Sequence, residues 1–176
     1  MNERGFTLAE LLVSVAVLGL VMAGVFVLQQ QGQIAYLWGS ARVEVQQNAR
    51  FALDLMTREL RSALSITSVG ANCNNTTGAD TITFTDASNA IVIYALSGSV
   101  LQRSYAGTNT DIIGGVASFK VFCYNADGYT PVAAGSEANI HSLRIVVETQ
   151  AESTTASGAA GAQRAIVESR VKLRNL

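Results

Sequence analysis

The hydrophobic pattern divides the chain into two parts with different periods. Residues 6–28 are apolar almost without interruption, and no proline occurs before Pro131 to break a helix. A helix of about 23 residues rises roughly 35 Å, enough to cross a hydrocarbon core of about 30 Å. The pattern therefore predicts a membrane-spanning helix over residues 6–28.

We expect the same helix to continue through residues 29–66 as an amphipathic segment. Apolar side chains recur there at helical spacing and form one stripe, made of Val45, Ala49, Ala52, Met56, Leu60 and Ala63. Phe51, Leu53 and Leu55 are expected to widen the stripe. The repeat is too short for a sustained coiled coil, so we expect the stripe to pack on the protein's own sheet.

Alternation with a period of two replaces the helical period in the domain expected over residues 67–176. The segments expected to form strands are residues 81–85, 90–96, 100–105, 116–124, 143–149 and 165–173. Ser97-Gly98-Ser99 predicts a hairpin turn, and a loop rich in small residues, 152–162, separates the last two strands. Short connections imply an antiparallel sheet. The predicted fold class is α+β, with one long N-terminal helix packed on one antiparallel sheet.

Charge is scarce, and the scarcity is local. The 176 residues are 49% hydrophobic and 14% charged, with a formal net charge of −1, whereas soluble domains usually carry about 25% charged residues. No charged side chain occurs between Glu10 and Arg42. This distribution excludes an ordinary cytosolic domain, and the near-zero net charge argues against a protein that binds polyanions.

Three interpretations of the N-terminal segment compete. A secretory signal peptide has an apolar stretch of about 7–15 residues and a small-residue cleavage site. Here the stretch is longer, and no clear A-x-A site occurs before Gln29. A plain signal anchor fits the length but leaves Glu10 unexplained, because carboxylates in membrane segments are rare. The third interpretation rests on the residues that precede the apolar run.

The junction R-G-F-T-L-A-E at residues 4–10 resembles that of the type IV prepilin family. A short polar leader ends in glycine, an aromatic residue follows, and a carboxylate comes four residues after the aromatic one. The resemblance implies that residues 1–5 are a leader peptide, removed by a prepilin peptidase between Gly5 and Phe6, and that Phe6 is N-methylated. It also implies a long N-terminal helix laid across an antiparallel sheet, which is the pilin fold.

Glu10 is the candidate assembly residue. In a packed bundle of apolar helices its carboxylate needs a cation, because an unpaired charge away from water is costly. The amine of a neighbouring chain's Phe6 is the natural partner, and such a pair would set the register between helices. The alternative, a glutamate tolerated at the membrane interface without a partner, stays open.

A second resemblance lies in the amphipathic segment. The run QQNARFALDLMTRELR at residues 46–61 is similar to that of PilW-type minor pilins and, more loosely, of J-type pseudopilins of type II secretion; residues 171–175 are similar to PilW-type endings. The implied partners are other pilin or pseudopilin subunits and the inner membrane. The implied location is a single-pass inner-membrane protein, with its globular domain outside the cytoplasm, that later enters a pilus or pseudopilus.

Cys73 and Cys123 are the two cysteines of the chain. A cysteine pair in an exported domain suggests a disulfide, here between a polar loop and a middle strand. Two separate thiols are the alternative, because a sequence does not contain the distance between them.

Candidate catalytic and metal-binding residues are few. His141 is the one histidine, and no nucleophile motif accompanies it, so we expect a surface or edge position. Asn125, Asp127 and Gly128 resemble the middle of a calcium loop, but Cys123 occupies the place of the first acidic ligand, which favours a plain turn. We therefore expect no enzyme, no metal, no cofactor and no small-molecule substrate.

The function that these features favour is that of a minor pilin, a structural subunit that assembles into or primes a type IV pilus through its N-terminal helix. A J-type pseudopilin is the first alternative. A tip adhesin or DNA-binding pilin is another, and it would need an exposed basic or aromatic patch. Candidates on the last strand are Arg164, Arg170, Lys172 and Arg174, although Glu168 interrupts them. Nucleic acid is thus a partner that the sequence permits but does not support.

Overall fold

The computed structural model describes residues 6–70, 73–74, 76–132, 136–151 and 163–173. The chain divides into two compact units, residues 1–40 and 41–176, and each is described by itself. A single helix, α1 (Leu8–Arg61), contributes to both units.

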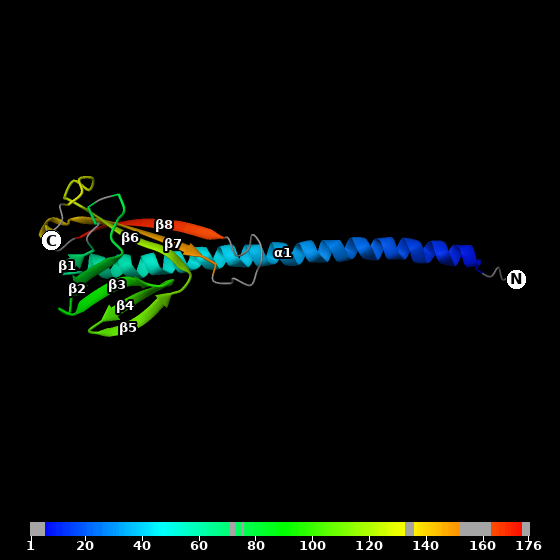
Figure 1. Cartoon of the computed structure of the whole chain (residues 1–176), viewed down its shortest axis with the longest axis horizontal. Coiled ribbons are helices and arrows are strands. Elements are labelled where there is room, and N and C mark those ends of the chain that lie inside the picture. The colour runs from blue at the N-terminus through cyan, green and yellow to red at the C-terminus, as the bar shows by residue number, and fades with distance from the viewer. Residues whose placement is uncertain (1–5, 71–72, 75, 133–135, 152–162, 174–176) are drawn as a thin grey trace. The chain divides into compact units, whose positions relative to one another are not determined.

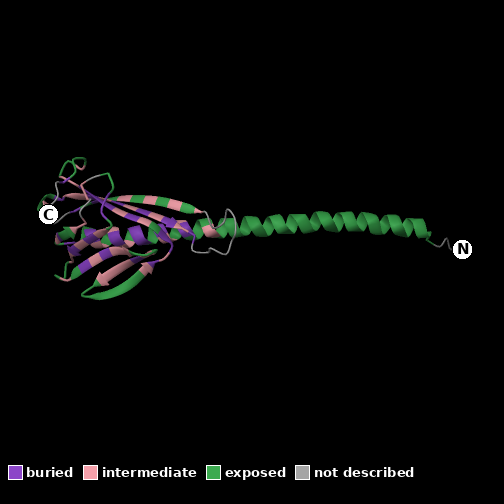
Figure 2. Ribbon diagram, viewed as in Figure 1, coloured by how far each residue is buried: buried purple, intermediate pink, exposed green. Residues whose placement is uncertain are grey.

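The first unit, where it is described, consists of the N-terminal part of α1 and the two residues before it. Every described residue from 6 to 40 is exposed, as the green ribbon in Figure 2 shows. This part of α1 is long and apolar enough to cross a membrane, and none of its apolar window is buried. The core helix of a soluble domain is mostly buried, and this window is not.

The second unit contains two antiparallel sheets rather than the one that the sequence predicted (Figure 1). The first is a meander of five strands in chain order: β1 (Ser65–Val69), β2 (Thr81–Thr85), β3 (Ile91–Ser97), β4 (Val100–Tyr105) and β5 (Thr108–Ile113). The second has three strands, also in chain order: β6 (Val116–Tyr124), β7 (Ser142–Gln150) and β8 (Arg164–Lys172). A short 3₁₀ helix, η1 (Glu137–Asn139), precedes β7.

One hydrophobic core joins the second part of α1 to both sheets. The predicted stripe is buried in full: Val45, Ala49, Ala52, Met56, Leu60 and Ala63 are each at most 3% exposed. Phe84 and Tyr94 of the five-stranded sheet and Phe119 and Ile145 of the three-stranded sheet belong to the same cluster as Met56. The purple bands of Figure 2 follow this helix face and the inward side of the strands. The prediction that the stripe packs on the protein's own sheet structure is confirmed.

The division into two sheets occurs between β5 and β6. Gly115 has a positive φ of 64°, a conformation that glycine adopts without strain. Its carbonyl accepts a hydrogen bond from the N–H of Gln150 at 2.6 Å, and the next residue, Val116, donates to Ser99 at 2.9 Å. The chain thus leaves one sheet at Ile113 and begins the other at Val116. Gly115 is visible in the sequence, but the succession of predicted strands along the chain does not show that strand pairing stops at this glycine.

Three further details differ from the prediction. The helix ends at Arg61 rather than at residue 66, because β1 begins at Ser65 and pairs with β2. The edge strands β1 and β5 were not predicted; their exposed polar residues hide the alternation.

Phe51, expected to widen the buried stripe, is 58% exposed, whereas Leu53 is buried. Position 51 is two residues from position 49, which places it about 200° around the helix from the buried face.

Candidate assembly site

Thr7 and Glu10 form a capping box at the start of α1. The backbone N–H and the hydroxyl of Thr7 both donate to Glu10 Oε2, each at 3.0 Å. In return the backbone N–H of Glu10 donates to Thr7 Oγ1 at 3.3 Å. These reciprocal bonds satisfy backbone donors that the first turn of a helix leaves without partners. The Thr-x-x-Glu spacing before an apolar run is the sequence signal that would have predicted the box.

The capping box gives the carboxylate of Glu10 a partner within its own chain. Both donors of Thr7 are bonded to Oε2, and within the described residues no donor is bonded to Oε1. A cation from another chain can therefore approach Oε1 without displacing the cap. The expected partner, the amine of a neighbouring Phe6, belongs to a second chain, so this pair stays a prediction.

Phe6 is exposed, with 83% of its surface accessible, and it immediately precedes the capping box. Gly5 lies outside the described residues, as does the rest of the expected leader, residues 1–5. The expected cleavage between Gly5 and Phe6 and the N-methylation of Phe6 therefore stay predictions from the resemblance.

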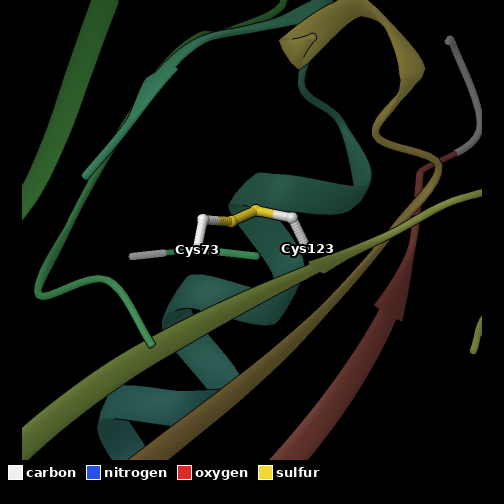
Figure 3. Close-up of a disulfide and its surroundings, with 2 residues drawn as sticks. All are labelled: Cys73 and Cys123. Atoms are coloured by element: carbon white, nitrogen blue, oxygen red, sulfur yellow. A yellow bond between two sulfur atoms is a disulfide. The ribbon is translucent and has the colours of Figure 1, made fainter. Parts of the chain in front are cut away.

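Cys73 and Cys123 form a disulfide, as the sequence suggested (Figure 3). Their Cα atoms are 5.4 Å apart and the two residues are separated by 50 positions. Next to the bond, the N–H of Cys123 donates to the carbonyl of Cys73 at 3.0 Å. Cys123 lies on β6, and Cys73 lies between β1 and β2. The bond therefore fastens the connection within the five-stranded sheet to the first strand of the three-stranded sheet.

Glu59 joins α1 to the five-stranded sheet through a partly buried network. Its Oε2 accepts hydrogen bonds from the hydroxyl of Tyr94 at 2.8 Å and from Nε of Arg103 at 3.1 Å. Burial, followed by the hydrogen bond to Glu59, raises the pKa of Tyr94 well above its usual range. Sequence reasoning missed this network, because its members are 35 and 44 residues apart and no local pattern connects them.

Thr149 and Thr57 join α1 to the three-stranded sheet. The hydroxyl of Thr149, a buried residue of β7, donates to the carbonyl of Val45 at 2.8 Å. The hydroxyl of Thr57 lies 3.4 Å from that of Ser169 on β8. The helix is therefore held to both sheets by polar bonds as well as by the core.

His141 and Asp127 occupy local structural positions. Nδ1 of His141 lies 2.9 Å from the carbonyl oxygen of Asn139, just before β7. Asp127 Oδ1 accepts from the backbone N–H groups of Tyr129 and Thr130, each at 2.9 Å, and Oδ2 accepts from the Thr130 hydroxyl. The Thr130 hydroxyl, then these backbone donors, lower the pKa of Asp127. The carboxylate thus closes a turn. Among the residues that the structure describes, no group of three or more His, Cys, Asp or Glu is placed to hold a metal.

The basic residues singled out on the last strand lie on β8. Arg164, Arg170 and Lys172 are exposed there, while Arg174 lies outside the described residues. Glu168 is also exposed, and its Oε2 is 3.7 Å from Nη1 of Arg144.

Together these features define a class of protein: a small α+β domain that carries an exposed apolar helix, with a carboxylate in the first turn of that helix. Residues 1–26 match the family described as the prokaryotic N-terminal methylation motif. The match covers this N-terminal segment only and does not extend to residues 27–176.

The other comparisons add little. No curated protein sequence is significantly similar to this chain. A chain in the crystal structure of the GspK-GspI-GspJ complex from the type 2 secretion system of enterotoxigenic Escherichia coli is similar in fold. The TM-score is 0.49 and the identity 14%, over 73% of this chain and 97% of that chain. A likeness of this size carries no conclusion about function or partners.

Proposed function

We propose that the protein is a minor pilin, a structural subunit that enters or primes a type IV pilus through its N-terminal helix. The observation that carries this proposal is the part of α1 from residue 8 to residue 28, which is apolar and wholly exposed and lies largely within the matched methylation motif of residues 1–26. Such an apolar surface is stable only when it is shielded from water, by lipid before assembly and by similar helices afterwards. A structural role of this kind needs no catalytic step and no cofactor.

The proposed maturation divides the chain as the sequence suggested. A prepilin peptidase removes residues 1–5 by cutting between Gly5 and Phe6, and the new amine is methylated. Residues 6–28 then span the inner membrane once, residues 29–66 lead from it, and the domain of residues 67–176 lies outside the cytoplasm. The partners are the peptidase, the membrane and other pilin subunits.

In the filament, Glu10 would keep its bonds to Thr7 and accept the methylated amine of a neighbouring Phe6. Two opposite charges brought together away from water attract far more strongly than at an aqueous surface. A subunit in the wrong register would leave both charges unpaired, which costs several kcal/mol by the usual estimates for buried ions. The pair thus selects one register among those that apolar packing alone permits.

Mass spectrometry of the protein isolated from its native membrane tests the maturation. We expect a chain that begins at Phe6 and carries one additional methyl group. A chain that still begins at Met1, or that begins at any other residue, would contradict the proposal.

Substitution of Glu10 by glutamine tests the assembly role, because Gln also completes a capping box. The variant Glu10→Gln should therefore fold, be processed and insert normally, yet be found in sheared pili at about a tenth of the normal amount or less, which corresponds to roughly 1.4 kcal/mol. Ser14→Ala, one turn further along the same exposed helix, is the matched control. Incorporation of Glu10→Gln at the level of the control would refute the charge pair.

A J-type pseudopilin is the second candidate, because the run at residues 46–61 is also, though more loosely, similar to that of J-type pseudopilins. Deletion of the gene distinguishes the two. A minor pilin predicts loss or shortening of surface pili with normal protein secretion, whereas a pseudopilin predicts retention of secretion substrates in the periplasm with normal pili.

A further inference from the structure

The three-stranded sheet has one face in the core and one face away from it. On β7, Leu143, Ile145 and Val147 are fully buried, so the alternate residues point to the opposite side. We call this side the outer face. Among the residues that the structure describes, its charged members are Lys120, Arg144, Glu148, Arg164, Glu168, Arg170 and Lys172. Five of these seven are basic, although the whole chain has a net charge of −1.

Two arginines are directly opposite one another on this face. Arg144 of β7 is the register partner of Arg170 of β8. Like charges in opposed positions destabilise a strand pair, so the arrangement needs a compensating group. Glu168 offers little compensation, because its carboxylate is 3.7 Å from Arg144 and its side chain is 61% exposed. The other acid of the face, Glu148, is paired with Arg164 at 3.2 Å.

Aromatic rings hold both guanidinium groups in place. Arg144 lies 4.3 Å from the centre of the Phe122 ring. Arg170 lies 5.4 Å from the ring of Tyr124 and 5.8 Å from that of Tyr129, and its Nη1 donates to the carbonyl of Gly128 at 3.3 Å. Cations held over aromatic faces retain their charge and in-plane N–H donors. The two guanidinium groups are therefore positioned before any ligand arrives.

The hydrogen-bonding capacity of Arg144 is not used within the described part of the chain. Its Nε is buried without a hydrogen-bond partner, and its contact with Glu168 is longer than a hydrogen bond. Beside it is a hollow of about 250 Å³ next to the disulfide, whose wall includes Asn74, Thr76, Phe122, Tyr124, Pro131 and Arg144. The hollow has the size of one or two side chains, and Arg144 is the charged residue among the described residues that line it.

We propose that this part of the outer face docks an acidic side chain, an aspartate or glutamate, of a neighbouring subunit. The carboxylate lies against Arg144 and Arg170, and the apolar part of the residue enters the hollow. Guanidinium groups match carboxylates in a planar two-point geometry, and a carboxylate removes the repulsion between the arginines. The identity of the partner as a neighbouring subunit rests on the proposed function; the chemistry of the site does not.

A protein carboxylate fits this face better than a nucleic acid does. A duplex or single strand carries many phosphates and is bound by a large basic excess. Here the excess is three charges, and Glu148 and Glu168 lie among them. A localised negative charge avoids both acids, whereas an extended polyanion passes over them.

Binding of a fluorescein-labelled, C-terminally amidated hexapeptide with one glutamate among alanines and glycines tests the proposal. The full-length protein is held in neutral detergent micelles, and fluorescence anisotropy is the readout. We expect saturable binding that Arg170→Gln weakens about tenfold or more. Arg164→Gln is the matched control, because Arg164 is on the same strand and outer face but already paired with Glu148. It should change the Kd by less than about twofold. Arg144→Gln should weaken binding as Arg170→Gln does.

Three results would overturn the proposal: no saturable binding, equal weakening by Arg164→Gln and Arg170→Gln, or tighter binding of a single-stranded hexanucleotide than of the peptide. Near-UV circular dichroism identifies a variant that has lost its fold, and the exposed Arg170 keeps the test valid if Arg144→Gln unfolds. The two proposals can fail separately, since Glu10→Gln leaves the outer face intact and Arg170→Gln leaves residues 6–28 intact.

Discussion

Glu59 and Arg103 form a two-point ion pair between α1 and β4. Nη2 of Arg103 lies 3.0 Å from Oε1 of Glu59, and Nε donates to Oε2 at 3.1 Å. The two side chains are only 22% and 23% exposed, so water screens the pair less than it screens a surface pair. The fork geometry fixes both the rotation of the helix and the position of the strand. The pair therefore helps to fix the position of the helix relative to the five-stranded sheet.

Removal of the charge on Glu59 should destabilise the domain. Glu59→Gln leaves Arg103 partly buried without its anion, and we expect the free energy of unfolding to fall by about 2 kcal/mol. Glu44→Gln, an exposed position on the same helix, should change it by less than about 0.5 kcal/mol. Urea unfolding of the protein in micelles, followed by near-UV circular dichroism, measures both. Equal effects of the two substitutions would show that the Glu59–Arg103 pair does not contribute to the free energy of unfolding.

Tyr94 should make the domain sensitive to alkali. Its folded pKa is raised, chiefly by burial, so the folded state retains the phenolic proton at pH values where the unfolded chain releases it. The corresponding stability is complete below the unfolded pKa of about 10 and decreases as the pH rises above it. Tyr94→Phe should cost about 1 kcal/mol at neutral pH, through the lost bond to Glu59, but should decline less steeply above pH 10. Parallel stability–pH curves for the two proteins would disprove this.

The disulfide should be a major source of stability. Cys73 and Cys123 are 50 residues apart, and closing a loop of that size contributes about 4 kcal/mol in the chain-entropy model. A reducing agent should therefore lower the urea midpoint of the wild-type protein markedly. The double variant Cys73→Ser, Cys123→Ser should have the lower midpoint from the start and not respond to the reductant. A wild-type midpoint that reductant leaves unchanged is the opposing result.

Thr7 should stabilise the first turn of α1 without contributing charge to assembly. Thr7→Val keeps the shape but removes the hydroxyl that bonds with Glu10, so the helix start should lose about 1 kcal/mol. Amide hydrogen exchange at Glu10, measured by NMR in micelles, should accelerate about fivefold, while Thr7→Ser should restore slow exchange. Because the Glu10 charge remains, incorporation of Thr7→Val into pili should stay within about twofold of normal. A loss as large as that of Glu10→Gln would assign the assembly defect to the cap instead of the charge.

The sequence by itself determined the elements whose signals are local. The length of the apolar run of residues 6–28 indicates a helix, and the stripe from Val45 to Leu60 follows a helical period, so α1 and its buried face were predictable. Strands with one buried face, such as β2, β6 and β7, alternate visibly and were predicted nearly to their ends. The capping box was also within reach, because Thr7 and Glu10 are three residues apart.

Only the tertiary structure decided which distant residues meet. The division into two sheets depends on where strand pairing stops, and no period in the sequence marks that point. Glu59 lies on a helix and Arg103 on a strand. As charged residues both would be placed at the solvent-exposed surface from sequence alone, and only the packing of the two elements brings them together. Arg144 and Arg170 face one another because of the register between β7 and β8. A shift of a single residue would send every side chain to the other face, and that register is set by the buried side of the sheet rather than by the arginines themselves.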